Sequence, residues 1–149
     1  MAAPVLAKWL FSFFPPNAPG IIPYDDVADR VRSVTEPGDR IFVWGEYPEI
    51  YWAANREPAT RFIHTGFLTG NSGGRDARLV RPSDGMPGAW DLLAADITAN
   101  PPDLIVDTSR ASIRKSEYHP LDQTFLWDAV RRDYRLTDVI DGVRLYERT

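Results

Sequence analysis

The stretch Arg40-Ile-Phe-Val-Trp44 decides the fold class of this chain. Four of its five residues are apolar and no polar residue interrupts them, which is typical of a strand buried on both faces of a sheet. The turn-forming residues Glu36-Pro-Gly-Asp39 precede the run, and Gly45 follows it. We therefore predict a central buried strand over residues 40–44.

Two later segments extend this sheet. Thr60-Arg-Phe-Ile-His64 and Asp103-Leu-Ile-Val-Asp107 are short runs of a similar kind, and we predict a second and a third strand there. Near the C-terminus, Asp141-Gly142 favours the two-residue turn of a β-hairpin. We therefore predict hairpin strands over residues 134–140 and 143–146.

Helical periodicity fills the segments between these strands. Apolar residues recur at intervals of three and four positions, as on the buried face of an amphipathic helix. Carboxylates at Asp25 and Asp26 suit the positive end of the first helix, and Pro48 suits the first turn of the second. The helices predicted from these patterns cover residues 25–34, 48–55, 90–97 and 120–129.

The alternation of strands and helices predicts an α/β fold. We expect a three-layer sandwich with a mostly parallel sheet, in which three strands run parallel and the C-terminal hairpin adds antiparallel strands at one edge. A chain of 149 residues suits one such domain. The predicted division is an aromatic and proline-rich segment over residues 1–23 and a single α/β domain over residues 24–149.

Composition disfavours several classes of function. A net charge of −4 and a pI near 5.1 argue against a nucleic-acid partner, because such proteins usually carry a basic surplus. The lack of cysteine excludes thiolate metal sites and cysteine nucleophiles, and the two histidines, His64 and His119, disfavour a histidine-rich metal site. The glycine-rich stretch Thr69-Gly-Asn-Ser-Gly-Gly-Arg75 lacks the Gly-Lys-Ser/Thr ending of a phosphate-binding loop. We expect no cofactor, no metal and no catalytic centre in this chain.

An aromatic segment lies ahead of the predicted domain. Residues 4–14 combine Trp and Phe with Lys8, a composition typical of membrane interfaces, yet they fall short of the about 20 apolar residues of a membrane span. Four prolines between residues 15 and 23 then predict a stiff connector. Two interpretations stay open: the segment docks at a membrane surface, or it folds onto its own domain or a partner.

Ligands of parallel α/β sheets bind at the carboxyl ends of the strands, and polar residues stand there in this sequence. Glu46 follows the first predicted strand, His64 ends the second and Asp107 ends the third, an arrangement that would suit an acid–base set. Each residue also has a structural explanation. Carboxylates favour helix starts, lone histidines are commonly hydrogen-bonded structural residues, and Asp107 precedes turn-forming residues. We favour the structural explanation for all three.

The predicted loop over residues 65–87 is rich in Gly, Ser and Arg. Arg75 and Arg78 are candidates for binding an anionic ligand, because a guanidinium pairs well with phosphate or carboxylate groups. A solvated basic loop is the favoured interpretation.

Aromatic residues and carboxylates cluster around the second predicted helix. Sugar rings stack on exposed Trp and Tyr side chains, so Trp44 and Trp52 beside Glu46 and Glu49 are candidates for binding a carbohydrate. Tyr51 and Trp52, however, fall on one face of the predicted helix, and we expect that face to pack on the sheet. Core packing is the favoured interpretation.

Three stretches resemble a known family. They are Pro37-Gly-Asp-Arg-Ile-Phe-Val-Trp-Gly-Glu-Tyr-Pro-Glu-Ile-Tyr-Trp52 with Arg56 and Pro58-Ala-Thr-Arg61, then Pro101-Pro-Asp-Leu-Ile-Val-Asp107, and the closing residues Tyr134 to Tyr146. Together they resemble the C-terminal soluble region of actinobacterial membrane glycosyltransferases of the protein O-mannosyltransferase and aminoarabinose-transferase type. The likeness covers residues 24–148.

The resemblance implies a location and a role. That family takes sugars from polyprenyl phosphates, and its acidic catalytic residues lie in a membrane domain upstream of the matched region. It therefore implies a non-catalytic accessory module on the extracytoplasmic side of the bacterial cell membrane, which binds an acceptor glycan or a partner, or supports the membrane domain. The implied partners are the membrane-embedded domain or the membrane surface, reached through residues 4–14.

Two alternatives to this role remain. One is a stand-alone small α/β enzyme or ligand-binding protein that uses the carboxyl ends of the strands. The other is an interaction domain that docks through its N-terminal segment.

Overall fold

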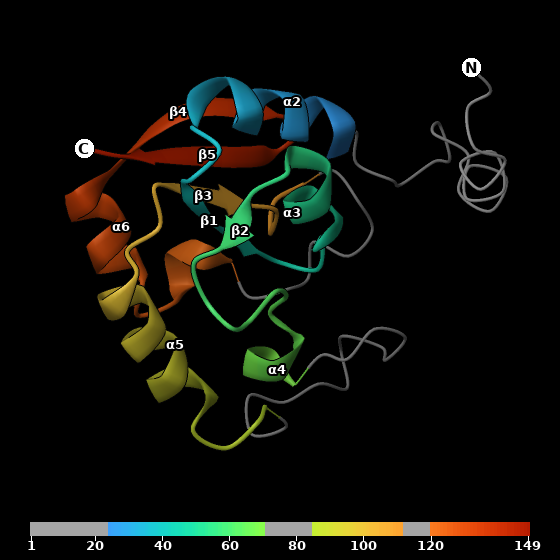
Figure 1. The fold of residues 1–149 in the computed structure, drawn as a ribbon. Coiled ribbons are helices and arrows are strands. Elements are labelled where there is room, and N and C mark those ends of the chain that lie inside the picture. Colours follow the sequence, from blue (N-terminus) through green and yellow to red (C-terminus); the bar gives the residue numbers. More distant parts are fainter. Residues whose placement is uncertain (1–23, 71–84, 112–119) are drawn as a thin grey trace, which may run out of the picture.

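A five-stranded mixed sheet lies at the centre of the computed structural model, which describes residues 24–70, 85–111 and 120–149 (Figure 1). The strand order is β2-β1-β3-β5-β4. The first three strands in the chain run parallel, and the last two form an antiparallel hairpin that joins the sheet beside β3. The α/β fold and the hairpin at one edge are thus confirmed. The strands are β1 Arg40–Trp44, β2 Glu57–Pro58, β3 Leu104–Asp107, β4 Tyr134–Ile140 and β5 Val143–Arg148.

Strand β1, which lies between β2 and β3, is buried on both faces, as predicted. Ile41 and Val43 belong to one apolar cluster, whereas Phe42 and Trp44 belong to a second. This division follows from the pleat, since successive side chains of a strand point to opposite faces of the sheet. Side chains from β3 and β5 join both clusters in the same alternating way.

Two helices contribute to the first cluster, namely α2 (Tyr24–Val34) and α3 (Glu49–Ala54). Both match predicted helices. Arg56 joins them, because its buried guanidinium donates hydrogen bonds to the Thr35 side chain and backbone carbonyl at 2.8 and 2.7 Å and to the carbonyl of Ala54 at 3.2 Å. These bonds satisfy carbonyl groups that the ends of the two helices leave unpaired.

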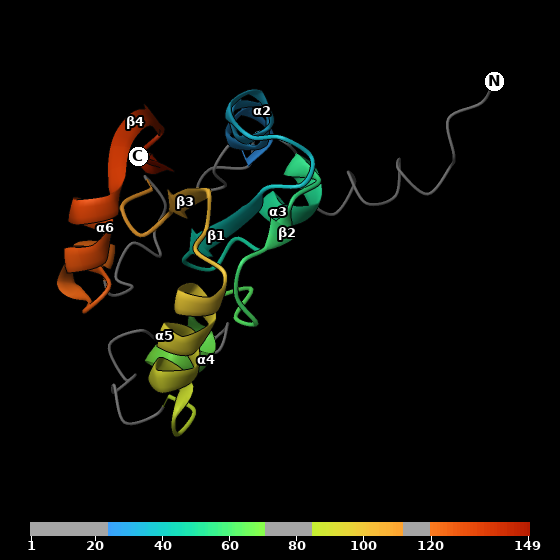
Figure 2. The same ribbon diagram turned by 60° about the vertical axis from the view of Figure 1, so that its left-hand side comes forward.

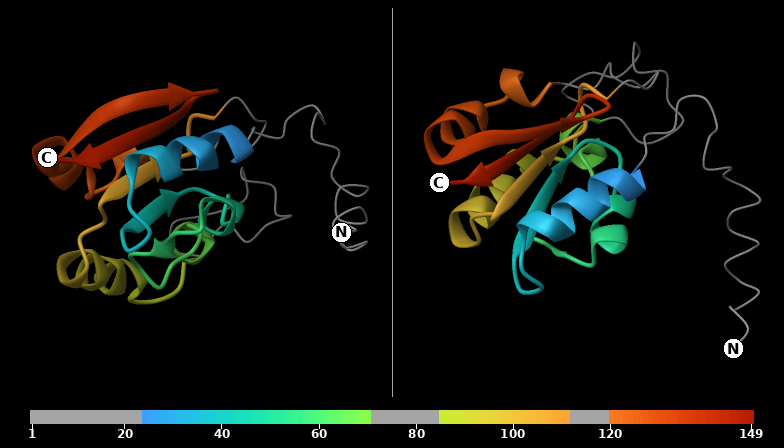
Figure 3. Two further views of the ribbon diagram at one scale, coloured as in Figure 1. Left: turned by 45° about the horizontal axis from the view of Figure 1, so that its top comes forward. Right: turned by 90° about the horizontal axis from the view of Figure 1, so that it is seen from above.

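The second cluster lies on the other face of the sheet. Figure 2 shows α2 on one side of β1 and β3, with α4 and α5 on the opposite side, and Figure 3 gives two further views of this arrangement. Apolar residues of these helices pack around Phe42 and Trp44. The elements of this face are α4 Gly66–Thr69, α5 Ala89–Ala99, the short 3-10 helix η3 Leu121–Gln123 and α6 Trp127–Asp133.

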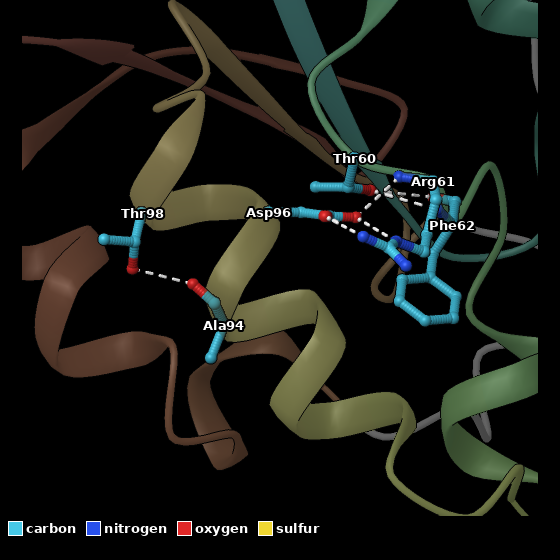
Figure 4. Close-up of polar contacts among 6 residues, drawn as sticks. All are labelled: Thr60, Arg61, Phe62, Ala94, Asp96 and Thr98. Carbon is cyan, nitrogen blue, oxygen red and sulfur yellow. Dashed lines mark hydrogen bonds and ion pairs between the residues drawn. The ribbon is translucent and has the colours of Figure 1, made fainter.

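The second strand differs from the prediction, because β2 is Glu57–Pro58 and residues 60–64 are not a strand. The reason is that side chains take the backbone donors of this segment. The N–H of Arg61 donates to a carboxylate oxygen of Asp96 at 2.9 Å, and the N–H of Phe62 donates to the hydroxyl of Thr60 at 3.3 Å (Figure 4). Those donors are therefore not available for a ladder with β1.

The helix predicted over residues 120–129 is also wrong in part. Two short helices, η3 and α6, take its place, and Thr124 between them is extended with φ −100° and ψ 162°. The Thr124 hydroxyl donates to the carbonyl of Leu121 at 2.8 Å, which favours a turn over a continuing helix. Phe125 is consequently 54% exposed, although the predicted helix would have buried it.

Three other segments complete the comparison with the sequence. The predicted loop over residues 65–87 begins with the short helix α4, and residues 71–84 lie outside the described part of the chain. The hairpin turn is confirmed at Asp141 and Gly142, which have φ values of +46° and +85°. These angles are typical of the type I′ turn that Asp-Gly favours. Residues 1–23, including the aromatic segment 4–14, also lie outside the described residues.

Candidate functional site

The strand order places a topological switch point between β1 and β3. The chain leaves β1, adds β2 on one side, and later adds β3 on the other side. In open α/β sheets the loops after two such strands diverge, and ligands bind in the crevice between them. Here those loops begin at Gly45 and Thr108, beside three of the polar residues that the sequence singles out.

Thr108 closes the strand ends at this point. Its N–H and its hydroxyl both donate to the carbonyl oxygen of Trp44, at 2.9 and 2.8 Å. Gly45 has φ +127°, and a Cβ at this position would lie 1.8 Å from Thr108 Oγ1. Because Gly45 has no Cβ, the Thr108 side chain fits beside it, between the two loops.

Glu46 and His64 lie together beside this closed point. Oε2 of Glu46 is 3.6 Å from Nδ1 of His64, and Oε1 accepts a hydrogen bond from the Thr65 hydroxyl at 3.3 Å. The N–H of Thr65 donates to the Gly45 carbonyl at 3.0 Å, so the segment reaches β1 without forming a strand. Two of the three predicted acid–base residues are thus brought together.

Hydrogen bonding determines the neutral tautomer of His64. The N–H of Gly66 donates to Nδ1 at 3.1 Å, so a neutral ring carries its proton on Nε2. The ring also stacks on Phe67, with 5.0 Å between the ring centroids. The histidine therefore holds the start of α4 against the sheet, as the structural explanation requires.

Asp107 forms a separate group on the neighbouring strand. The residue is only 2% exposed, and its Oδ1 accepts hydrogen bonds from the N–H and hydroxyl of Ser109 at 2.9 and 2.6 Å. Burial raises the pKa of the Asp107 carboxyl, while the Ser109 bonds and the charge of Arg144 act in the opposite direction and Asp122 adds to the rise. These contacts are those of a buried carboxylate that caps its own turn.

Sequence reasoning missed Arg144 as a neighbour of Asp107. The two residues are directly opposite each other in the antiparallel β3–β5 ladder. The alternation of β5 predicts which face Arg144 occupies, but only the strand register shows its partner.

Trp44 is part of the core and not of a ligand site. Its side chain is fully buried, and its ring contacts Phe42 at 6.2 Å and Trp90 at 6.0 Å between centroids. Burial of the indole is the ordinary role of a Trp in a strand with both faces covered.

Trp52 is exposed, so the prediction that its face of the helix packs on the sheet is wrong for this residue. Tyr51 is buried and its hydroxyl oxygen accepts a hydrogen bond from the N–H of Val43 at 2.8 Å, whereas Trp52 is 85% exposed. Adjacent helical residues are about 100° apart, so both rings cannot face the sheet once Tyr51 is bonded to β1. Glu49, one turn before Trp52, is exposed as well.

The remaining candidates do not form a further site in the described part of the chain. Arg75 and Arg78 lie outside the described residues. Within residues 24–70, 85–111 and 120–149, no three His, Asp or Glu side chains are grouped as metal ligands. In the same residues, no helix has the length and apolar character needed to cross a membrane.

Comparisons with known proteins do not add a relative. No protein-family model, no curated protein and no solved structure matches this chain.

Proposed function

We propose that this chain is a non-catalytic accessory module of a membrane glycosyltransferase that uses polyprenyl-phosphate sugars. The module would lie on the extracytoplasmic side of a bacterial cell membrane and bind an acceptor or a partner, or support the membrane domain. The resemblance of residues 24–148 to the soluble region of such enzymes supports this proposal, as does the polar chemistry of the strand ends.

The observation that carries the non-catalytic role is the closure of the switch point. Thr108 fills the position between the two loops, where an α/β enzyme would hold its ligand. The Asp107 carboxylate accepts a hydrogen bond from the Ser109 hydroxyl, and His64, which lies beside Glu46, accepts one from the N–H of Gly66 at the start of α4. Every candidate acid or base at this edge therefore has an internal partner that explains its presence.

We also propose that the helices and the sheet form a three-layer sandwich. Two apolar clusters, one on each face of the sheet, support it. Such a sandwich buries both faces of the sheet by itself, so a partner would be bound at an outer surface of the helices.

Fractionation of the native protein tests the proposal. An antibody against residues 24–149 is used to probe membrane and soluble fractions of the source cells. A band much larger than 16.9 kDa in the membrane fraction is expected, because the module would be one part of a longer chain. A soluble band near 16.9 kDa would overturn the proposal.

The N-terminal segment provides a second measurement for the partner. If residues 4–14 dock at a membrane or on the membrane domain, deleting residues 1–19 reduces the fraction of the chain that sediments with membranes. Unchanged sedimentation would remove this segment as the docking site.

A stand-alone enzyme at the strand-end edge is the second candidate, favoured by the 3.6 Å approach of Glu46 and His64. Histidine and glutamate are both common general acids and bases. The triple variant Glu46→Gln, His64→Gln and Asp107→Asn tests it, with Asp91→Asn on α5 as a control. Loss of a measured activity in the triple variant alone supports an enzyme, whereas retained activity contradicts it.

A further inference from the structure

Trp52 is an exception among the tryptophans of the described residues. Trp44 is fully buried, and Trp90 and Trp127 pack against the second apolar cluster, whereas Trp52 is 85% exposed. An indole ring is the largest apolar surface that a side chain offers, and folded proteins generally use it for packing or for binding. In α3 the packing role belongs to Ile50, Tyr51 and Ala54, so Trp52 is left without a role in the core.

Two polar side chains flank the exposed indole. Glu49 is three residues before Trp52 and Asn55 three residues after it, so all three lie along the same outer side of α3. Both flanking residues are exposed, and neither the Glu49 carboxylate nor the Asn55 side-chain amide forms a hydrogen bond or ion pair with another described residue. A flat apolar ring is thus bordered by a free acceptor and a free amide.

The backbone holds this arrangement in place. Asn55 has φ +52°, in the left-handed region, and its N–H donates to the carbonyl of Trp52 at 3.1 Å. Glycine is the residue that this C-terminal position of a helix favours most, and asparagine is the usual second choice. The amide is therefore presented at a position where glycine would serve the backbone at least as well.

The hydrogen-bonding groups beside the ring suit a polyol ligand. Arg32 lies at the same end of α3, where its guanidinium donates to the carbonyl of Ala53 and pairs with Asp29. Because Arg32 is already paired, the groups open to a ligand over Trp52 are the Glu49 acceptor and the Asn55 amide, which a polyol can meet on both sides. A ring with one apolar C–H face and hydroxyl groups at its rim satisfies all of these groups.

We propose that Trp52, Glu49 and Asn55 form a binding site for one pyranose ring of a neutral oligosaccharide. The ring stacks on the indole, its hydroxyls donate to Glu49, and the amide of Asn55 both donates and accepts. This inference deepens the accessory role proposed above, on which its biological meaning as acceptor binding rests. Sugar binding itself is a property of this chain and is measured independently of where the native protein is found.

Nuclear magnetic resonance of the labelled full chain tests the site. The indole N–H signal of Trp52 is assigned by its disappearance in Trp52→Phe, and the chain is titrated with mannobiose, cellobiose and maltose, and separately with choline chloride. A saturable shift of this signal with at least one disaccharide is expected. No shift with any of the three, or a shift with choline alone, would overturn the proposal, the latter in favour of a cationic ligand.

Three variants assign the binding to the named side chains. Trp52→Ala and Glu49→Gln are each expected to weaken disaccharide binding, the former by about tenfold, because an aromatic stack contributes up to about 1.5 kcal/mol. Asn55→Gly is the most informative, since glycine relieves the left-handed backbone while removing the amide. We expect weaker sugar binding with an unchanged or raised melting temperature.

A control and a contrary outcome complete the design. Phe125→Ala removes another exposed aromatic ring from the opposite face of the sheet and should leave the titration unchanged. Equal weakening by this variant would show nonspecific stacking and overturn the proposal. A large fall in the melting temperature of Trp52→Ala would do the same, because it would reveal a packing role for the indole.

The outcome is separable from that of the proposed function. A soluble native protein of 16.9 kDa that binds a disaccharide through Trp52 would contradict the glycosyltransferase module and retain the site. A larger, membrane-bound native protein that does not bind a disaccharide would support the glycosyltransferase module and contradict the Trp52 site.

Discussion

Replacing Gly45 by alanine tests the closed strand edge most directly. The residue has φ +127°, and its new Cβ would stand 1.8 Å from Thr108 Oγ1. The strained backbone costs on the order of 1–3 kcal/mol. Displacing the hydroxyl costs about 1 kcal/mol more, because its hydrogen bond to Trp44 is lost. We expect Gly45→Ala to lower the free energy of unfolding by about 2–4 kcal/mol, a large share of the about 5–15 kcal/mol typical of a domain.

Urea unfolding followed by tryptophan fluorescence measures this loss as a lower midpoint at an unchanged slope. The double variant Gly45→Ala/Thr108→Ala separates the two causes, since it removes the hydroxyl that the new methyl group meets but keeps the backbone strain. We expect it to be about 1 kcal/mol more stable than the sum of the single changes predicts. The reasoning is refuted if Gly45→Ala stays within about 0.5 kcal/mol of the parent, or if the two changes simply add.

Three further predictions concern other contacts of the sheet and its helices. Gly142→Ala should lower the free energy of unfolding by roughly 2–3 kcal/mol. Its φ is +85° and a Cβ would lie 2.3 Å from a backbone carbonyl oxygen, so a urea midpoint equal to the parent's would contradict that contact. Burial raises the pKa of Asp107, so this carboxyl's contribution to stability falls as pH rises from the ordinary carboxyl pKa through the raised one. Asp107→Asn should flatten that part of the stability–pH profile, and an unchanged profile would count against a buried, ionising Asp107. Hydrogen bonding to Arg61 lowers the pKa of Asp96, so its contribution is present above the ordinary carboxyl pKa and is lost as pH falls through the lowered one. Asp96→Asn should therefore destabilise the chain at neutral pH and by less in acid, as thermal melts at the two pH values would show; equal effects at both would argue against the ion pair.

The parts of the fold that sequence predicted best are those in which burial alone decides the structure. The run Arg40–Trp44 is apolar on both faces, and Leu104–Asp107 pairs with it in register, so the apolar runs themselves identify both strands. The hairpin at Asp141 and Gly142 was equally predictable, because its turn requires two positive φ angles that this dipeptide supplies.

Prediction failed where a side chain forms a hydrogen bond with the backbone and so decides its structure. Residues 60–64 were predicted as a short strand, but the N–H of Arg61 is bonded to Asp96, which is 35 residues away. The short segment around Thr124 has apolar residues at helical spacing, yet its own hydroxyl bond favours a turn. Neither hydrogen bond shows in the periodicity of apolar residues, since the first depends on a tertiary contact and the second on a local side-chain bond, each worth about 1 kcal/mol.

The location of the candidate site was predictable from the sequence, but the contacts of its residues were not. Strand ends placed Glu46, His64 and Asp107 near one edge of the sheet, and the structure brings the first two within 3.6 Å. What the sequence could not supply is the closure by Thr108, because only the approach of two loops shows that Gly45 is needed for a contact within the chain. The exposure of Trp52 was hidden for a similar reason. It depends on Tyr51 taking the bond to β1.

These two findings bear on the function together. A glycine after the first strand of an α/β sheet usually lets a ligand approach the backbone, as in dinucleotide-binding folds. Here the same freedom is used by Thr108, whose hydroxyl occupies the space and satisfies the carbonyl of Trp44. A ligand that took the place of the Thr108 hydroxyl would have to break its buried hydrogen bond to Trp44, whereas a ligand on α3 would cover an indole that now lies in water. Binding at the outer surface of α3, as proposed above, would therefore require no such rearrangement of the fold.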